Sequence, residues 1–289
     1  MTGKIQITVA KSAGFCPGVK NAIDKVLELA KQRQRTIYTL GPLIHNKQVI
    51  ETLKGQNIYA VSSPAEIKER RAILVIRAHG IAPQDEAAIR ALDLEVIDAT
   101  CPLVKHVQEN IRAHARKGYA TIIVGDRDHA EVLGLMGYTE GRGFVVDGPG
   151  EVRGLPRFEK ANIVAQTTQE YDIFLAAAEE ARGNCGELVI SDTICTPTRQ
   201  RQEETVKLAR NSDLVIVVGG KNSANTTRLF QICLRLAKNA VHIEKEDELR
   251  ESSLKGAASI FITAGASTPT WMVEKVLEKT RALTEKNLQ

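Results

Sequence analysis

The stretch EVIDATCPLVKHVQENI, residues 95–111, runs an apolar strand into a cysteine and a proline and then into a helix. The same order recurs in ITVAKSAGFCPGVKNAIDKVL, residues 7–27, and in LVISDTICTPTRQRQEETV, residues 188–206. Proline is favoured in the first turn of a helix because it has no N–H to leave unpaired, so each cysteine is expected at or beside an N-cap. The helix dipole lowers the pKa of a thiol placed there. Three equivalent thiolates at three such junctions predict one shared metal site.

The three cysteines at these junctions are Cys16, Cys101 and Cys195. A lone cysteine after a buried strand is more often a small core hydrophobe than a ligand. That alternative weakens when three cysteines share one local context. Cys185, in the loop-like stretch RGNCGE, and Cys233, on the apolar stripe of a helix, lack this context and are expected to be structural.

Length and composition narrow the class of protein. The chain has 289 residues, enough for two or three domains, and its 43% hydrophobic and 26% charged residues are typical of globular proteins. Five widely spaced cysteines do not form a secreted disulfide framework. The first residues contain no apolar signal core, and no apolar run approaches the length of a membrane span. We expect a cytoplasmic protein that does not enter the membrane.

The charge pattern favours a small anionic ligand over nucleic acid. The net charge is +4, and the basic residues are dispersed among acidic ones. Aromatic residues make up only 4% of the chain, too few for platforms on which bases stack. We therefore expect no nucleic-acid partner.

Apolar, β-branched runs separated by helical segments predict a repeated α/β fold. The predicted strands are residues 37–40, 58–61, 73–76 and 95–99, then 121–125, 144–146, 162–166 and 188–192, and then 214–219, 241–244 and 259–264. The third set lacks one strand. Residues 5–10, at the start of the chain, supply it if the repeat is circularly permuted, so that the N-terminal strand completes the C-terminal unit. Alternating strands and helices favour parallel sheets with crossover helices.

This repeat predicts three small α/β domains with parallel sheets. Their boundaries are expected at 14–100, 101–193 and 194–289, with the N-terminal strand in 1–13 completing the third domain. The period is longer than that of solenoid repeats, which favours domains over stacked small units.

Polar side chains recur at equivalent positions in the three units. After the first strand of each unit come His45, His129 and Ser223. Two residues further along stand Lys47, Glu131 and Asn225. After the third strand come His79, the pair Thr167 and Thr168, and Ser267. Ligands of open α/β sheets bind beyond the carboxyl ends of the strands, where helix N-termini also point. Three such edges turned toward one centre would surround the thiolates with a polar ring suited to a phosphorylated ligand.

Each of these residues also has a structural alternative. His, Ser and Thr at such junctions are often N-caps. Glu131 could be a first-turn glutamate that favours the helix dipole, but a buried carboxylate among neutral donors is costly unless it handles protons. The stretch GGKNSANTTR, residues 219–228, lacks the spacing of a Walker loop, although its small polar residues could cradle phosphate.

The spacing of the cysteines restricts the metal. Local zinc sites use closely paired ligands, and this chain has no such pair. Iron–sulfur clusters normally take four thiolates, so three would leave one iron open for catalysis. An open iron with a nearby carboxylic acid predicts reductive removal of a hydroxyl as water from a substrate that carries phosphate.

At these residues the chain closely resembles the 4-hydroxy-3-methylbut-2-enyl diphosphate reductases, the LytB-type enzymes that end the methylerythritol phosphate route to isoprenoids. The matching motifs, in order, are GFCPGV (14–19), GPLIHN (41–46), RAHG (77–80), DATCP (98–102), GDRDHAEVLG (125–134), QTT (166–168), DTICTPTRQRQ (192–202), KNSANT (221–226) and AGASTP (264–269). The resemblance covers nearly the whole chain. It implies a three-domain trefoil around a central [4Fe-4S] cluster.

The resemblance also implies roles for individual residues. Cys16, Cys101 and Cys195 match the cluster ligands and leave the fourth iron open. The matches to groups that bind the diphosphate are His45, His79, His129, Ser223, Asn225 and Ser267. Catalytic roles fall to Glu131 as proton donor, to His129, and to Thr168 or its neighbour Thr167, which holds the substrate hydroxyl. Ala224 stands where some members carry a second serine, whose contact a backbone N–H could replace.

The reaction implied by the resemblance takes up two electrons and two protons, expels water and gives isopentenyl and dimethylallyl diphosphates. A ferredoxin or a flavodoxin would supply the electrons one at a time. Two alternatives stay open on the residues alone. One is a non-catalytic iron–sulfur electron carrier, and the other is a metal-independent diphosphate-binding protein with three core cysteines.

Overall fold

The computed structural model describes residues 5–33, 35–69 and 71–286, and these form two compact units. Unit 1 combines three stretches, Met1–Pro17, His45–Val49 and Thr196–Gln289. Unit 2 combines Gly18–Ile44 and Ile50–Cys195. Each unit is described by itself below.

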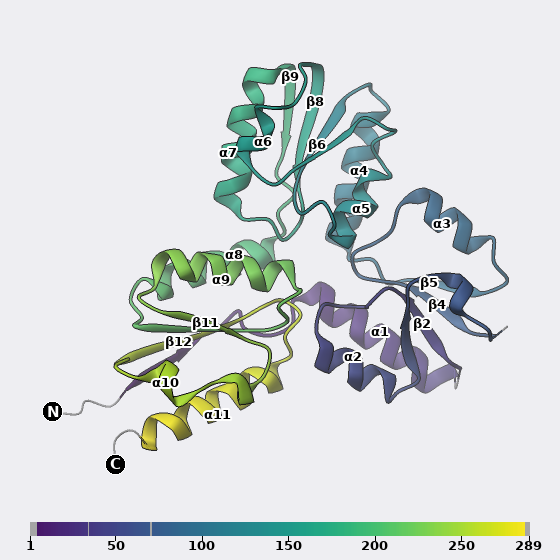
Figure 1. Ribbon diagram of the computed structural model, residues 1–289. Coiled ribbons are helices and arrows are strands. Elements are labelled where there is room, and N and C mark those ends of the chain that lie inside the picture. The colour runs from purple at the N-terminus through teal and green to yellow at the C-terminus, as the bar shows by residue number, and fades with distance from the viewer. Residues whose placement is uncertain (1–4, 34, 70, 287–289) are drawn as a thin grey trace. The chain divides into compact units, whose positions relative to one another are not determined.

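Unit 2 contains two parallel four-stranded sheets with the strand orders β3-β2-β4-β5 and β7-β6-β8-β9 (Figure 1). The strands are β2 (Ile37–Leu40), β3 (Ile58–Val61), β4 (Ile73–Ile76), β5 (Glu95–Asp98), β6 (Ala120–Val124), β7 (Gly143–Val146), β8 (Phe158–Ala165) and β9 (Cys185–Ser191). The helices that precede or connect these strands are α1 (Pro17–Arg33), α2 (Lys47–Lys54), α3 (Pro83–Arg90), α4 (Pro102–Ala115), α5 (Ala130–Met136), α6 (Pro149–Val152) and α7 (Tyr171–Ala181), with 3-10 turns at Pro64–Glu66 and Arg182–Asn184. Helices α1 and α2 begin in the first two stretches of unit 1.

Unit 1 contains one parallel sheet with the strand order β1-β12-β10-β11. Its strands are β1 (Gln6–Val9), β10 (Leu214–Val218), β11 (Ala240–Ile243) and β12 (Ser259–Ala264). Its helices are α8 (Thr196–Ala209), α9 (Ala224–Leu236), α10 (Glu251–Leu254) and α11 (Thr270–Lys286), with a 3-10 turn at Glu246–Glu248. Because β1 pairs with β12, the first strand of the chain belongs to the sheet that the last strand completes.

The central strands of the sheets are buried on both faces. β4 and β10 consist only of Ile, Leu and Val, and every residue in them is buried. Continuous apolar runs of this kind are typical of parallel strands covered by helices on both sides. In unit 1, Val215 and Val217 pack with Leu229 of α9, while Ile216 on the other face packs with Val276 of α11. Figure 1 shows α8 and α9 on one side of this sheet and α11 on the other.

The predicted α/β fold with three repeated parallel sheets is confirmed. The domain boundaries predicted from the sequence remain predictions. Among the described residues, the helices are too short or too polar for any of them to cross a lipid bilayer.

Two strands begin three or more residues earlier than predicted. β8 starts four residues and β9 three residues before the predicted positions, because Phe158 pairs with Cys185 and the ladder between the two strands continues from there. The added residues include exposed polar side chains, so no apolar run marked them. Cys185 was expected in a loop, and this expectation was wrong, because it is the first residue of β9.

Candidate functional site

The three junction cysteines occupy equivalent positions at the carboxyl ends of their sheets. Each one directly precedes a helix, namely α1, α4 or α8. In each sheet the cysteine N–H donates to a backbone carbonyl in the loop that follows the neighbouring strand. That carbonyl lies two residues after the end of β12, β4 or β8. These bonds run from Cys16 to Ala266, from Cys101 to Ala78 and from Cys195 to Thr167, and each is 3.0 Å long. Three sequence-distant cysteines are therefore fixed by one repeated backbone contact.

The other two cysteines have different surroundings. All five lie in the described part of the chain, where none forms a disulfide. Cys16, Cys101 and Cys195 are partly exposed, whereas Cys233 is fully buried in an apolar cluster of unit 1. Burial raises the pKa of Cys233 to about 12, and it also raises the pKa of Cys185. Burial thus disfavours the thiolate form of both.

Glu131 and Thr167 form a buried pair in unit 2. Glu131 lies in the first turn of α5 and is 2% exposed. Its carboxylate accepts the Thr167 N–H at 2.6 Å and the Thr167 hydroxyl at 2.8 Å, one on each oxygen. The carbonyl of the same threonine accepts the Cys195 N–H. Thr167 thus contacts the Glu131 carboxylate through its N–H and its hydroxyl, and it contacts the Cys195 N–H through its carbonyl.

The two candidate threonines have different partners. Thr167 contacts Glu131, whereas the Thr168 hydroxyl accepts a hydrogen bond of 3.1 Å from the Gln166 side chain. Thr168 comes directly after Thr167, whose carbonyl accepts the Cys195 N–H. His79 and Ser267 have the same position in their own sheets, directly after the carbonyl that accepts a cysteine N–H. Thr168 thus has the place of the polar ring residues, and Thr167 has the contact with the carboxylate.

His129 is the N-cap of α5, and its Nδ1 accepts the Glu131 N–H at 3.2 Å. An accepting Nδ1 leaves Nε2 as the donor of the neutral ring. The ring of His129 meets that of His79 edge to face, with centroids 5.3 Å apart. His129 therefore does cap a helix, which was the structural alternative considered for it. Because Nδ1 is used in the cap, Nε2 is the ring atom left to donate.

The polar residues of unit 1 gather around the N-terminus of α9. Ser223 caps this helix, accepting the Thr226 N–H at 3.4 Å. The Ser267 hydroxyl lies 3.4 Å from the Ser223 hydroxyl and 3.3 Å from the His45 carbonyl. Asn225 is 5% exposed, and its side-chain nitrogen has no hydrogen-bond partner among the described residues. Hydroxyl and amide donors at a helix N-terminus suit an anion such as phosphate.

Glycines allow these loops to pack closely. A Cβ on Gly220 would lie 2.5 Å from the His45 carbonyl, so the backbones of the two loops touch there. Gly219, which directly follows β10, has a φ of +144°, a region that favours glycine. The GGKNS stretch therefore approaches the His45 carbonyl closely at Gly220, where it has no side chain.

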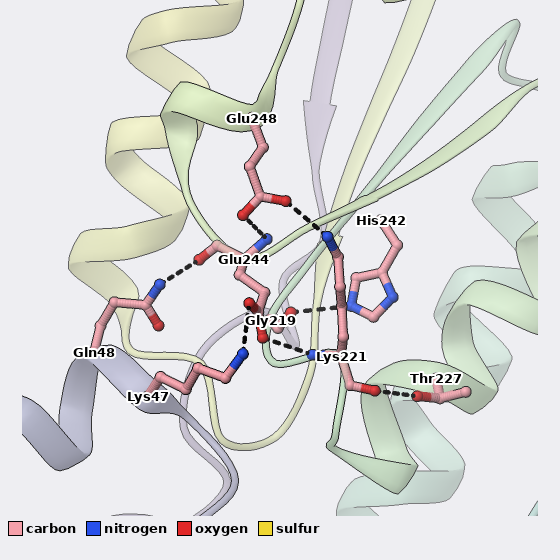
Figure 2. A network of polar contacts seen from close by, with 8 residues as sticks. All are labelled: Lys47, Gln48, Gly219, Lys221, Thr227, His242, Glu244 and Glu248. Atoms are coloured by element: carbon pink, nitrogen blue, oxygen red, sulfur yellow. Dashed lines mark hydrogen bonds and ion pairs between the residues drawn. The ribbon is translucent and has the colours of Figure 1, made fainter.

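A polar network behind this loop joins it to the segment that carries His45 (Figure 2). The Glu244 carboxylate pairs with Lys47 Nζ at 3.3 Å and accepts the Lys221 N–H at 3.0 Å. The Glu244 carbonyl accepts the Gln48 side chain at 3.2 Å, and Lys221 Nζ pairs with Glu248 at 2.9 Å. Partial burial raises the pKa of Glu244, but the hydrogen bonds from Lys221 and Lys47 outweigh this and hold it below its ordinary value.

Sequence reasoning missed this network. His242 had no identified partner, yet its Nε2 lies 2.9 Å from the Gly219 carbonyl. Glu244 belongs to no motif. The one available signal was its position directly after β11, at the carboxyl edge where the predicted site residues also lie.

The fold and these junctions define an α/β protein of three repeated parallel sheets, each ending in a cysteine that precedes a helix. The family model described as LytB protein matches residues 7–281, and the chain belongs to this family.

Several relatives are similar over nearly their full length. The 4-hydroxy-3-methylbut-2-enyl diphosphate reductase of Citrifermentans bemidjiense is 43% identical over 282 residues, which cover 96% of this chain and 98% of that protein. The enzyme of the same name from Aquifex aeolicus is 41% identical and covers 98% of this chain and 99% of its own length.

Solved structures agree with these relatives. A structure of (E)-4-hydroxy-3-methyl-but-2-enyl diphosphate reductase, described as the terminal enzyme of the non-mevalonate pathway, is 40% identical with a TM-score of 0.70, covering 96% of this chain and 99% of that one. The reductase from Plasmodium falciparum is 28% identical with a TM-score of 0.90, covering 96% and 88%.

The His242 contact predicts a pH dependence of unit 1. Burial lowers the pKa of His242, against the smaller opposing effect of its bond to Gly219, while Lys221 lowers it and Glu244 and Glu248 raise it. A depressed histidine pKa means that the unfolded chain binds the proton more readily. Stability should therefore fall as the pH drops below about 6.5, the ordinary value for histidine.

Urea unfolding between pH 8 and pH 5, followed by the fluorescence of Trp271, measures this effect, because the chain's one tryptophan lies in unit 1. His242→Gln keeps a donor for the Gly219 carbonyl and removes the titration, so its unfolding midpoint should vary less with pH. Equal pH profiles for the two proteins would contradict this assignment.

Proposed function

We propose that this chain reduces 4-hydroxy-3-methylbut-2-enyl diphosphate, the substrate for which its relatives are named. The carbon–oxygen bond to the hydroxyl breaks and a carbon–hydrogen bond forms, with two electrons and two protons consumed and one water released. The products are isopentenyl and dimethylallyl diphosphates. The observation that carries the proposal is the repeated cysteine junction, in a chain 40–43% identical to enzymes of this name over nearly its full length.

Cys16, Cys101 and Cys195 would hold a [4Fe-4S] cluster. Their equivalent positions and partial exposure fit this role, since ligand thiols must be reachable and deprotonated. Three thiolates leave one iron without a protein ligand. When bound, such a cluster supplies low-potential electrons and a Lewis-acid position for the substrate hydroxyl. The trefoil with domains 14–100, 101–193 and 194–289 plus 1–13 is part of this proposal.

The diphosphate would bind to the polar groups that follow the strands. In unit 1 these are His45, Ser223, Asn225 and Ser267, with the backbone N–H of Ala224 at the start of α9. In unit 2 they are His79, His129 and Thr168. The unpaired Asn225 amide supports this assignment, because a buried donor without a partner costs about 1 to 3 kcal/mol unless a ligand accepts from it.

Glu131 and Thr167 would handle the proton. A protonated Glu131 can donate to the Thr167 hydroxyl, which in turn donates to the leaving hydroxyl group of the substrate. The 2.8 Å contact between them supports a direct transfer. A proton delivered through the threonine hydroxyl leaves the Glu131 carboxylate held by the Thr167 N–H, which stabilises its charge.

A small one-electron carrier such as a ferredoxin or flavodoxin would supply the electrons, and the reaction would take place in the cytoplasm. The test of the whole proposal is anaerobic oxidation of a reduced viologen dye by cluster-loaded protein, with and without the substrate. Oxidation that depends on the substrate supports the reductase. Its absence in protein with full iron and sulfide content would contradict it and favour a non-catalytic electron carrier.

Removing one ligand thiol should abolish cluster binding. Cys101→Ser is expected to retain little iron after anaerobic reconstitution, because serine is a poor ligand for iron–sulfur iron. Cys185→Ser is the matched control, since it changes a cysteine at the start of an edge strand, and it should load normally. Iron and sulfide analysis measures both. A fully loaded Cys101→Ser protein would rule out the ligand set.

Glu131→Gln should keep the cluster and substrate binding but slow turnover by about 10²- to 10⁴-fold, the usual contribution of general acid–base catalysis. The viologen assay and a substrate-binding titration measure the two effects separately. Near-normal turnover would remove Glu131 from the proton path.

The neighbouring threonines provide a matched pair for the same assay. Thr167→Val removes the hydroxyl that contacts Glu131, whereas Thr168→Val removes one that contacts Gln166. Turnover should fall more with the first change than with the second. The opposite order would transfer the relay role to Thr168.

A further inference from the structure

The loop that carries Cys16 is the longest of the three cysteine junctions. Six residues separate Cys16 from the end of β1, whereas two separate Cys101 from β5 and three separate Cys195 from β9. Longer connections have more conformations to lose, so they need more contacts to stay ordered. The backbone bond to Ala266 fixes only the end of this loop.

Glu204 of α8 holds the beginning of the loop. Its two carboxylate oxygens accept the N–H groups of Lys11 and Ser12 at 2.8 Å and 2.9 Å. Hydrogen bonds to an ionised acceptor are about twice as strong as bonds between neutral groups. One side chain thus satisfies two consecutive backbone donors at the point where the chain leaves β1.

Arg201, one turn earlier on α8, holds the other part of the loop. It is 3% exposed, and its Nη2 donates to the Gly14 carbonyl at 3.1 Å, two residues before Cys16. Its Nη1 donates to the Ala264 carbonyl, the last residue of β12, at 2.8 Å. The planar guanidinium therefore ties the loop to the sheet with a geometry that lysine cannot reproduce.

The packing around Gly14 leaves little freedom for another arrangement. Gly14 has a φ of +120°, and a Cβ there would lie 3.2 Å from the Thr270 hydroxyl. A side chain at this position would be strained and would crowd Thr270, and the Gly14 carbonyl accepts the bond from Arg201. Glycine permits this backbone conformation, and the arginine supplies the contact that keeps it.

We propose that Arg201 and Glu204 are positioning residues that fix Cys16 as a metal ligand. They stand three residues apart, on one face of a helix whose first residue follows Cys195 in the chain. Helix α8, which begins directly after Cys195, thus carries both side chains that order the loop of Cys16. This inference rests on the proposed function, since it takes Cys16 to be a cluster ligand.

Glu204→Gln tests the proposal with little change in volume. Glutamine retains one acceptor oxygen and turns an NH₂ group toward a backbone N–H, so one of the two bonds is lost. Arg201→Lys is the second variant, because an ammonium group cannot reach both carbonyls with the same geometry. Glu203→Gln and Arg210→Lys are the controls, since both side chains are exposed on the same segment.

Three measurements are made on each protein. Amide hydrogen exchange in the cluster-free chain reports the order of residues 10–16. The rate at which the chelator bathophenanthroline disulfonate removes iron from the loaded protein under anaerobic conditions reports how firmly the cluster is held, and the electron paramagnetic resonance spectrum of the reduced cluster reports its geometry.

In both test variants we expect faster exchange confined to residues 10–16, iron release about tenfold faster, and a broadened spectrum, while the controls match the wild type. Folded Glu204→Gln protein with the wild-type exchange, release rate and spectrum would overturn the proposal, and this variant decides the question if Arg201→Lys does not fold. A wild-type chain that loads no cluster would instead overturn the proposed function, whatever the exchange data show.

Discussion

The hydrogen bond from each junction cysteine to the carbonyl beyond a neighbouring strand is the contact on which the candidate site depends. It exists because parallel strands end at the same edge and leave the next backbone groups without a ladder partner. A cysteine placed there has its main chain fixed by the sheet, while its side chain stays partly exposed. The same bond in three sheets gives three thiols the same local setting without requiring them to be close in the sequence.

Most of the fold could be predicted because buried parallel strands consist of consecutive apolar residues, which are visible in the sequence. Strands such as β4 and β12 match the predicted ranges, since every position or nearly every position in them faces the core. The early residues of β8 and β9 could not be predicted in this way. Their side chains are partly solvated, and what makes them strand is pairing with each other, which a local pattern does not contain.

The same distinction applies to the candidate site: local sequence patterns identified some of its residues, whereas contacts between distant segments could not be predicted. Residues such as Glu131 and Ser267 were found because a repeat set them at matching places after strands. The contact between Glu131 and Thr167 depends on how α5 meets the end of β8, so the sequence left both threonines open. Arg201, Glu204 and Glu244 act through long-range contacts with backbone groups, and neither charge nor spacing in the sequence distinguishes them from solvated residues.

The pairing of β1 with β12 sets an order of events during synthesis. The carbonyl that receives the Cys16 N–H belongs to Ala266, which lies far from it in the sequence. Domains generally fold as units, and a contact between such distant residues pays a large loop-closure cost. Cys16 therefore cannot be fixed in its sheet until the chain has been synthesised past Ala266. If Cys16 is a cluster ligand, as proposed above, its loop becomes ordered only on a chain already extended through β12.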